Sequence, residues 1–106
     1  MVTRKLIYFA LIVLLSVAGA VQAGGDPARG AQLAADCADC HGNDGMGDGD
    51  TIPQIAGLDE AAFVQKLAGF KSGEIPDPDG MMADYVADLS EQDMADLAAY
   101  YSKMKQ

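Results

Sequence analysis

Five consecutive residues, Cys37-Ala38-Asp39-Cys40-His41, carry the side chains best suited to chemistry in this chain. A C-x-x-C-H run is the pattern of covalent c-type haem attachment, in which the two thiols form thioether bonds with the haem vinyl groups. The adjacent histidine then lies where it can ligate the iron. The chain has no other cysteine and no other histidine. The spacing therefore predicts one covalent haem c held by Cys37 and Cys40, with His41 as an axial iron ligand.

Three other roles of the cysteine pair remain open as alternatives. A thioredoxin-like redox pair belongs in a βαβ context, and no strand pattern flanks this motif. A structural zinc site needs four ligands, whereas these five residues offer three. A structural disulfide between Cys37 and Cys40 is the third alternative.

A six-coordinate haem that transfers electrons needs a second axial ligand. Because the chain has a single histidine, methionine is the candidate, and methionine ligation raises the reduction potential. Four of the six methionines are poor candidates, since they lie near the chain ends, in a helical apolar pattern or within five residues of the histidine: Met1, Met46, Met94 and Met104. Met81 and Met82 remain, in a downstream segment that reads as an irregular loop. One of this pair is expected to ligate, with simple core packing as the alternative.

The first 23 residues have the pattern of a cleavable signal peptide. Arg4 and Lys5 precede a run of apolar residues, and small residues lead up to a cleavage point after Ala23. The apolar run is short for a spanning helix, which needs about 20 residues, so an uncleaved anchor is the less favoured alternative. We expect residues 1–23 to be removed, which leaves residues 24–106 as one domain without a membrane span in the bacterial periplasm.

The chain is strongly acidic, with a formal net charge of −9, and two of its seven basic residues fall in the signal segment. Such a charge argues against nucleic acid as a partner. An acidic surface either keeps a protein soluble or docks a basic redox protein, and both readings remain open. Asp44, Asp48 and Asp50 follow the motif but lack the ligand order of a calcium loop.

Three helices are predicted to position these residues. The first begins at the N-cap Asp26 and runs through Ala35 into the cysteine motif. The second extends from the N-cap Asp59 to Gly73, and the third begins at the N-cap Ser90. The apolar residues expected on their buried faces are Phe63, Leu67, Phe70, Met94, Leu97, Ala98 and Tyr101. Gly- and Pro-rich loops join the helices, and no β-strand is expected.

The order of these features resembles a class I c-type cytochrome of the short bacterial monohaem type. The resemblance rests on the C-x-x-C-H motif followed by Gly42, on the Met81-Met82 pair and on Leu89-Ser90, and it covers nearly all of the mature chain. Parts of the chain are also similar to the repeated halves of dihaem periplasmic cytochromes and to the haem subunit of flavocytochrome c sulfide dehydrogenase. The resemblance implies an all-α cytochrome c fold, with three to four helices around one covalently bound haem.

The resemblance also implies roles for single residues. The motif cysteines would carry the thioether bonds and His41 would ligate the iron. The ligand methionine of the family precedes its Leu-Ser pair by seven and eight positions, which selects Met82, with Met81 as the runner-up. The carbonyl oxygen of Pro53 would accept the ring N–H of His41. Gly30 would lie where the first and last helices cross.

The implied function is periplasmic electron transfer, with the chain acting as a carrier and not as an enzyme. One alternative is a haem subunit that accepts electrons from a flavoprotein dehydrogenase, such as a sulfide dehydrogenase. A less favoured alternative is an open-site haem sensor or peroxidase, since a methionine ligand would fill the site. The expected partners are redox proteins, among which a flavoprotein dehydrogenase and a terminal oxidase are the candidates.

Overall fold

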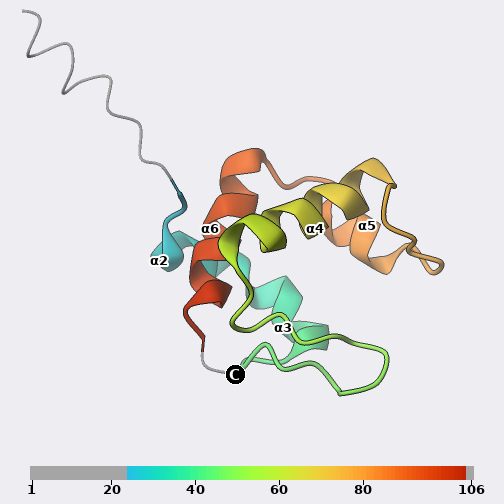
Figure 1. Cartoon of the computed structure of the whole chain (residues 1–106), viewed down its shortest axis with the longest axis horizontal. Coiled ribbons are helices and arrows are strands. Elements are labelled where there is room, and N and C mark those ends of the chain that lie inside the picture. The colour runs from blue at the N-terminus through green and yellow to red at the C-terminus, as the bar shows by residue number, and fades with distance from the viewer. Residues whose placement is uncertain (1–23, 105–106) are drawn as a thin grey trace, which may run out of the picture.

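Helices joined by long loops make up the computed structural model of the chain, which describes residues 24–104 (Figure 1). The signal peptide predicted for residues 1–23 lies outside the described residues. The helices are α2 (Pro27–Leu33), α3 (Ala35–His41), α4 (Glu60–Ser72), α5 (Met81–Val86) and α6 (Glu91–Ser102). No strand forms within residues 24–104, and no helix there is long and apolar enough to cross a membrane.

The predicted helix starts are present as side-chain caps. The carboxylate of Asp26 caps α2, with Pro27 at the first helical position. The carboxylate of Asp59 caps α4 in the same way. At the start of α6, Ser90 and Asp93 form a reciprocal capping box. Each cap satisfies an amide that has no partner within its own helix, so the sequence signal and the helix start agree.

The structure corrects two of the helix predictions and contains five helices in its described part. The first predicted helix does not run straight into the motif, because Ala34 has a ψ of −10° and separates α2 from α3. Met81 and Met82 do not lie in an irregular loop, because they begin α5. The carboxylates of Asp77 and Asp79 accept amide hydrogens from the first turn of α5. The two prolines just before this helix are typical of a loop, so the sequence pattern did not indicate the helix start.

The first and last helices of the described chain cross closely at Gly30 (Figure 1). A Cβ atom at this position would overlap the backbone carbonyl of Asp96 and lie 2.8 Å from the Cβ of Tyr100. Glycine therefore lets α2 approach α6 to a distance that no other residue allows without movement of a backbone. The crossing expected at Gly30 is present.

A buried carboxylate fastens the same crossing. Asp96 is 1% exposed. Its Oδ1 accepts hydrogen bonds from the amide of Asp26 at 2.7 Å and from Nε2 of Gln92 at 2.8 Å. Its Oδ2 lies 2.7 Å from a guanidinium nitrogen of Arg29, and the same nitrogen lies 2.6 Å from Asp93. Because every oxygen of the buried carboxylate has a partner, the charge is tolerated inside the fold.

This network makes the stability of the fold sensitive to acid. The amide of Asp26 first, and then the side chain of Arg29, hold the pKa of Asp96 below its usual value. The folded pKa is thus lower than the unfolded one of about 3.9, so the stabilisation is present above about pH 4 and is lost as the pH falls further. We expect the melting temperature of Asp96→Asn, followed by circular dichroism, to be lower at pH 7 and to approach that of the wild type below pH 4. A constant difference between the two proteins across this range would contradict the assignment.

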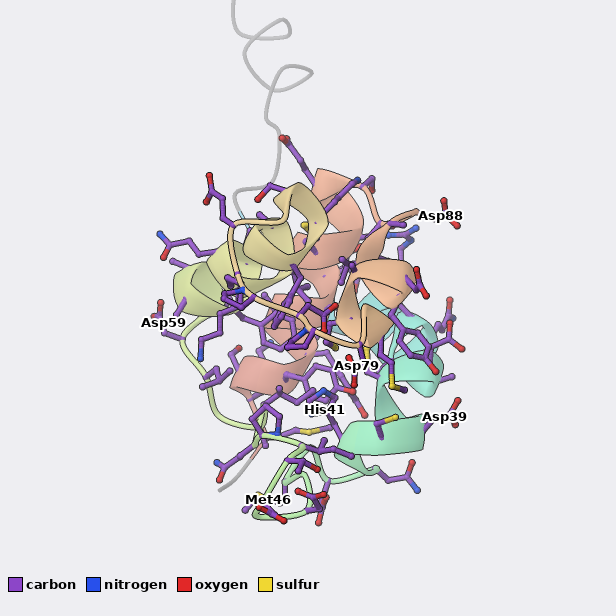
Figure 2. All side chains as sticks on the ribbon, turned by 90° about the vertical axis from the view of Figure 1, so that its right-hand side faces the viewer. Asp39, His41, Met46, Asp59, Asp79 and Asp88 are labelled. Atoms are coloured by element: carbon purple, nitrogen blue, oxygen red, sulfur yellow. The ribbon has the colours of Figure 1, made fainter. Side chains whose placement is uncertain are left out.

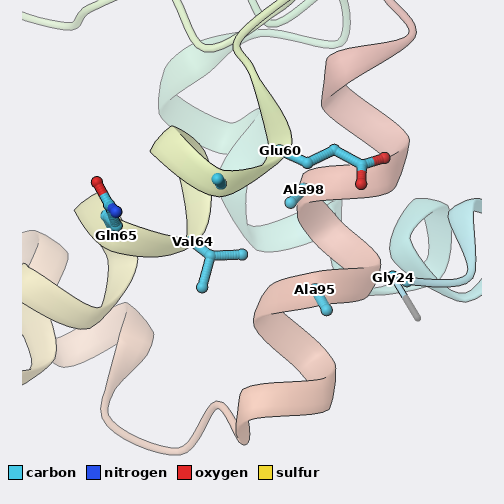
Figure 3. Close-up of a pocket in the computed structure, with 8 residues that line it drawn as sticks. Gly24, Glu60, Val64, Gln65, Ala95 and Ala98 are labelled. Carbon is cyan, nitrogen blue, oxygen red and sulfur yellow. The ribbon is translucent and has the colours of Figure 1, made fainter. Parts of the chain in front are cut away.

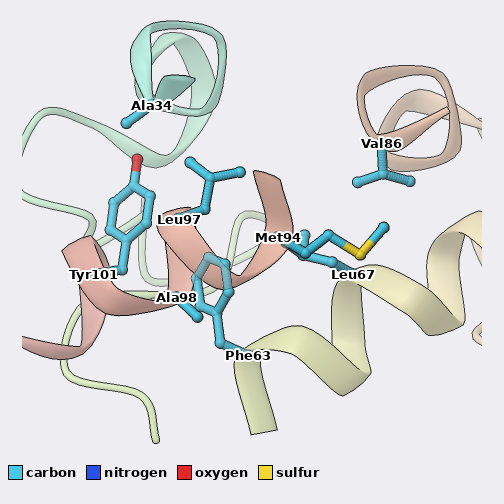
Figure 4. Packing of buried hydrophobic residues seen from close by; sticks show 8 residues of the cluster. All are labelled: Ala34, Phe63, Leu67, Val86, Met94, Leu97, Ala98 and Tyr101. Carbon is cyan, nitrogen blue, oxygen red and sulfur yellow. The ribbon is translucent and has the colours of Figure 1, made fainter. Parts of the chain in front are cut away.

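The hydrophobic core lies between α6 and the helices around it (Figure 4). Its buried residues are Ala34, Phe63, Leu67, Val86, Met94, Leu97, Ala98 and Tyr101. The predicted apolar faces of α4 and α6 are therefore buried, except that Phe70 packs at the edge of the core and is partly exposed. The rings of Phe63 and Tyr101 stack with their centroids 5.5 Å apart. Ala34 and Val86 tie α3 and α5 to this core, and these two helices carry the cysteine motif and the methionine pair.

Candidate haem site

The cysteine motif is helical, and its three chemical groups share one face of α3. Cys37, Cys40 and His41 are spaced i, i+3 and i+4, positions that are neighbours on a helix surface. Both thiols are free and partly buried, and His41 is 7% exposed. Burial raises the pKa of the Cys37 thiol, so this group remains protonated at neutral pH. Two thiols and one imidazole thus lie together, close to the core.

A hydrogen bond from the loop after α3 orients the imidazole. Nδ1 of His41 lies 2.8 Å from the carbonyl oxygen of Pro53. In the tautomer that donates from Nδ1 to this carbonyl, the lone pair of Nε2 remains available for a metal ion. The contact that the resemblance implied for Pro53 is therefore present in the structure. A carbonyl in this position fixes the ring and strengthens it as a ligand.

The loop itself is held in place by backbone contacts that bring Pro53 to the histidine. The amide of Gly47 donates to the carbonyl oxygen of His41 at 2.8 Å. Gly47 has a φ of +69°, a value that favours glycine. Further along the loop, Oδ1 of Asp48 accepts the amides of Asp50 and Ile52 at 2.8 Å each. These bonds lower the pKa of Asp48 and use its carboxylate to shape the loop.

The two candidate methionines differ in their surroundings. Met82 is partly buried and packs against the hydrophobic core. Met81 is 49% exposed and lines a shallow surface recess with Asp84 and Tyr85. An axial ligand has to be turned toward the interior of the domain, so the packing favours Met82. Of the remaining methionines in the described chain, Met94 is buried in the core beneath α4.

The donor set fits a covalently bound haem c. Two free thiols lie on the helical face that also carries an imidazole, and the hydrogen bond at Nδ1 leaves Nε2 for iron. A partly buried thioether is supplied by a different helix, α5. Figure 2 shows His41 near the centre of one face of the molecule, between the ribbons of α3 and α5. These elements come from distant parts of the chain; α3 packs on α2 and α5 packs on α4, and both α2 and α4 pack on α6.

The sequence of the chain was compared with known proteins and protein families. Residues 27–105 match the sequence profile of the family described as Cytochrome c. The chain belongs to the cytochrome c family. Cytochrome c-554(547) of Halothiobacillus neapolitanus is 40% identical over 91 residues, which cover 76% of this chain and 99% of that protein. Cytochrome c4 of Azotobacter vinelandii is 35% identical over 102 residues, which cover 90% of this chain and 49% of that one.

Solved cytochrome structures have the same fold. Cytochrome c4 of Acidithiobacillus ferrooxidans superposes with a TM-score of 0.67 at 28% identity, covering 79% of this chain and 51% of that chain. This member of the cytochrome c family thus spans about half the length of the cytochrome c4 relatives that it matches. The resemblance to a short class I c-type cytochrome and the all-α cytochrome c fold are both confirmed.

Two features of the site region were not predicted from the sequence. One is the network of Asp96 and Arg29, which the apolar pattern of α6 does not indicate, because Asp96 lies on the side of the helix away from Met94, Leu97 and Tyr101. The other is the recess on α5 lined by Met81, Asp84 and Tyr85. In the irregular loop that the sequence predicts for this segment, the i, i+4 spacing of Met81 and Tyr85 would not make them neighbours.

Proposed function

We propose that this chain is a periplasmic electron carrier with one covalently attached haem c, and not an enzyme in itself. The observation that carries the proposal is the shared face of Cys37, Cys40 and His41 on α3, with the histidine ring bonded to Pro53. Membership of the cytochrome c family supports it. When bound, the haem supplies one-electron ferric and ferrous chemistry. Residues 1–23 act as the cleaved signal peptide, and residues 24–106 form the cytochrome domain.

The residues of the chain would hold and tune the group as follows. Cys37 and Cys40 would form the thioether links, and His41 would ligate through Nε2. Met82, with Met81 as the alternative, would provide the second iron ligand, and a methionine ligand keeps the potential high. The carbonyl of Pro53 holds the ring of His41 in one orientation. The core packing behind α3 and α5 keeps water from this region, which further stabilises the less charged, reduced state.

The test is an absorption spectrum of the periplasmic protein in its oxidised and reduced states. We expect sharp reduced c-type bands and, in the oxidised protein, the weak red band of methionine-ligated ferric haem. Replacing both Cys37 and Cys40 with alanine should leave any haem extractable by acidic acetone, because no covalent link remains. Asp39→Asn, within the same motif, is the matched control and should keep its haem bound.

Two outcomes of this experiment would contradict the proposal. A protein purified without haem from cells that mature c-type cytochromes would leave Cys37 and Cys40 as a thiol or disulfide pair. A c-type spectrum without the red band would indicate an open or differently ligated iron, and hence a sensor or peroxidase.

A second candidate is a haem subunit that accepts electrons from a flavoprotein dehydrogenase. The exposed apolar side chains of Met46, Met81 and Tyr85 favour a lasting protein contact of this kind. Co-purification of a flavoprotein in constant ratio with this chain would support the subunit role. A monomer that exchanges electrons with several unrelated proteins would support the free carrier.

A further inference from the structure

Two large apolar side chains lie exposed on one face of α5. Met81 is 49% exposed and Tyr85 is 43% exposed, and their i, i+4 spacing makes them neighbours on the helix. Together with Asp84 they line a recess of about 350 Å³. Adjacent exposed apolar side chains on a small domain mark a contact surface. Because α5 also carries Met82, the recess borders the proposed haem site.

Exposed carboxylates lie on the same helix as this apolar patch, on α3 and on the loops beside them. The exposed aspartates of α3, α5 and the loops beside them include Asp39, Asp44, Asp79, Asp84 and Asp88. We call these five residues, together with Met46, Met81 and Tyr85, the acidic face. Figure 2 shows this side of the molecule, with Asp39 and Asp79 nearer to His41, Asp88 at the upper edge and Met46 at the lower edge.

One basic residue lies beside this charge: the amine of Lys71 donates to the carbonyl oxygen of Leu89 at 2.6 Å, next to Asp88. Residues 30–65 and 72–102, which contain α3, α5 and the loops beside them, have no lysine or arginine. Within the described chain the basic residues are Arg29, Lys66, Lys71 and Lys103. Arg29 is already bound by Asp93 and Asp96 at the helix crossing. With five aspartates and Lys71 next to Asp88, the acidic face keeps a net negative charge, which attracts a positively charged protein over a range of about one Debye length.

We propose that the acidic face docks a basic redox protein, which inserts a lysine or arginine side chain into the recess of α5. The aliphatic stem of that side chain would pack on Met81 and Tyr85, while its charged head pairs with Asp84. A tyrosine ring also attracts a cation at its face. The inference rests on the proposed electron carrier and names the chemistry of its partner. A second copy of this chain fits less well, because it would bring its own carboxylates to the contact.

A second recess lies on another part of the surface, and its lining does not indicate a charged or apolar partner. It has a volume of about 400 Å³ and lies between α4 and α6, lined mainly by small residues such as Gly24, Ala95 and Ala98 (Figure 3). Glu60 at its edge also lies close to Ser102, with 3.4 Å between the carboxylate and the hydroxyl. Since Glu60 is an exposed carboxylate away from the acidic face, it provides a matched control for a change of one charge.

The test uses the haem-loaded protein and a lysine-rich cytochrome c as the basic probe. Binding of the two oxidised proteins is measured by isothermal titration calorimetry, and electron exchange is measured by stopped flow as the ionic strength rises. The reduced chain loses one electron as the oxidised probe gains one. We expect both the affinity and the bimolecular rate constant to fall with salt. An acidic flavodoxin is the probe of opposite charge and should not bind.

Four variants separate the parts of the proposal. At low salt Asp84→Asn should lower the rate constant severalfold and Asp84→Lys should lower it further, and both should approach the wild type at high salt. Tyr85→Ala should weaken binding at every salt concentration, because it removes apolar contact and no charge. Glu60→Gln, with the same change of charge as Asp84→Asn, should match the wild type.

The outcomes that overturn the proposal are distinct. If Glu60→Gln slows the reaction as much as Asp84→Asn, the partner docks elsewhere. If Tyr85→Ala converts a dimer of this chain into a monomer and leaves binding of the probe unchanged, the face is a contact between copies. Mediated redox cycling of the chain at an electrode tests the carrier function separately from the docking of a partner. A chain that cycles normally but shows no salt dependence overturns the docking proposal alone, whereas a chain that cannot cycle overturns the carrier function as well.

Discussion

Met82→Ala should lose the spectrum of methionine-ligated haem, whereas Met81→Ala should keep it. Met82 packs against the core, while Met81 is 49% exposed beside the recess of α5. Removal of the thioether at position 82 leaves an axial position open to water or a small ligand. We expect the weak red band of the oxidised protein to disappear. We also expect the reduced protein to bind carbon monoxide at neutral pH, and its reduction potential to fall.

The variant Met81→Ala is the control for the loss of the methionine-ligated spectrum. Met81→Ala removes the same side chain one position earlier on the same helix, so it controls for a general weakening of α5. Retention of haem in both proteins, measured after acidic acetone extraction, shows that Cys37 and Cys40 still hold it. A normal spectrum for Met82→Ala with a changed one for Met81→Ala would reverse the assignment.

Gly30→Val should destabilise the folded protein by about 3 kcal/mol, near the upper end of what overpacking costs. A side chain at this position meets the backbone of Asp96, which belongs to a rigid helix and cannot rotate away. The variant therefore has to separate α2 from α6, which also stretches the bonds of Arg29 to its two carboxylates. Chemical denaturation of the haem-loaded protein measures the loss. Ala31→Val is the control, because residue 31 is exposed on the same helix and its substitution costs about 0.5 kcal/mol through helix propensity.

The smaller change Gly30→Ala tests the sign of the effect. Helix propensity alone favours alanine over glycine by about 1 kcal/mol. The close approach to Asp96 opposes it, because even one methyl group overlaps the carbonyl. A stabilised Gly30→Ala protein would mean that the helices cross less closely than the structure shows.

The parts of the fold that the sequence predicted are those with local signals. The caps Asp26, Asp59 and Ser90 act on amides within their own first turns, so their side chains mark helix starts without reference to the rest of the fold. The apolar faces of α4 and α6 recur at the helical period and are buried almost as expected. The resemblance to known cytochromes supplied the contact between His41 and Pro53, which no local pattern would have indicated.

The parts that could not be predicted depend on contacts between distant segments. A helix of six residues at Met81–Val86 is too short for a recognisable period, and its start depends on aspartates placed by the preceding prolines. The different burial of Met81 and Met82 depends on the helix that contains them. In α5, Met82 packs against the core and Met81 is exposed. The burial of Asp96 follows from partners about 70 positions away in the chain, at the start of the domain.

The bond between Asp26 and Asp96 joins residues 70 positions apart, so it closes a ring that contains almost the whole domain. Closing so long a ring costs chain entropy before any packing is gained, and proteins with many such contacts fold slowly. His41 and Met82 lie inside the ring, and on the proposed ligation they would be joined through a single iron ion. This inner link shortens the free chain that remains to be ordered between the first and last helices. On the proposed ligation, haem attachment would therefore lower the entropy cost of closing the outer ring between Asp26 and Asp96.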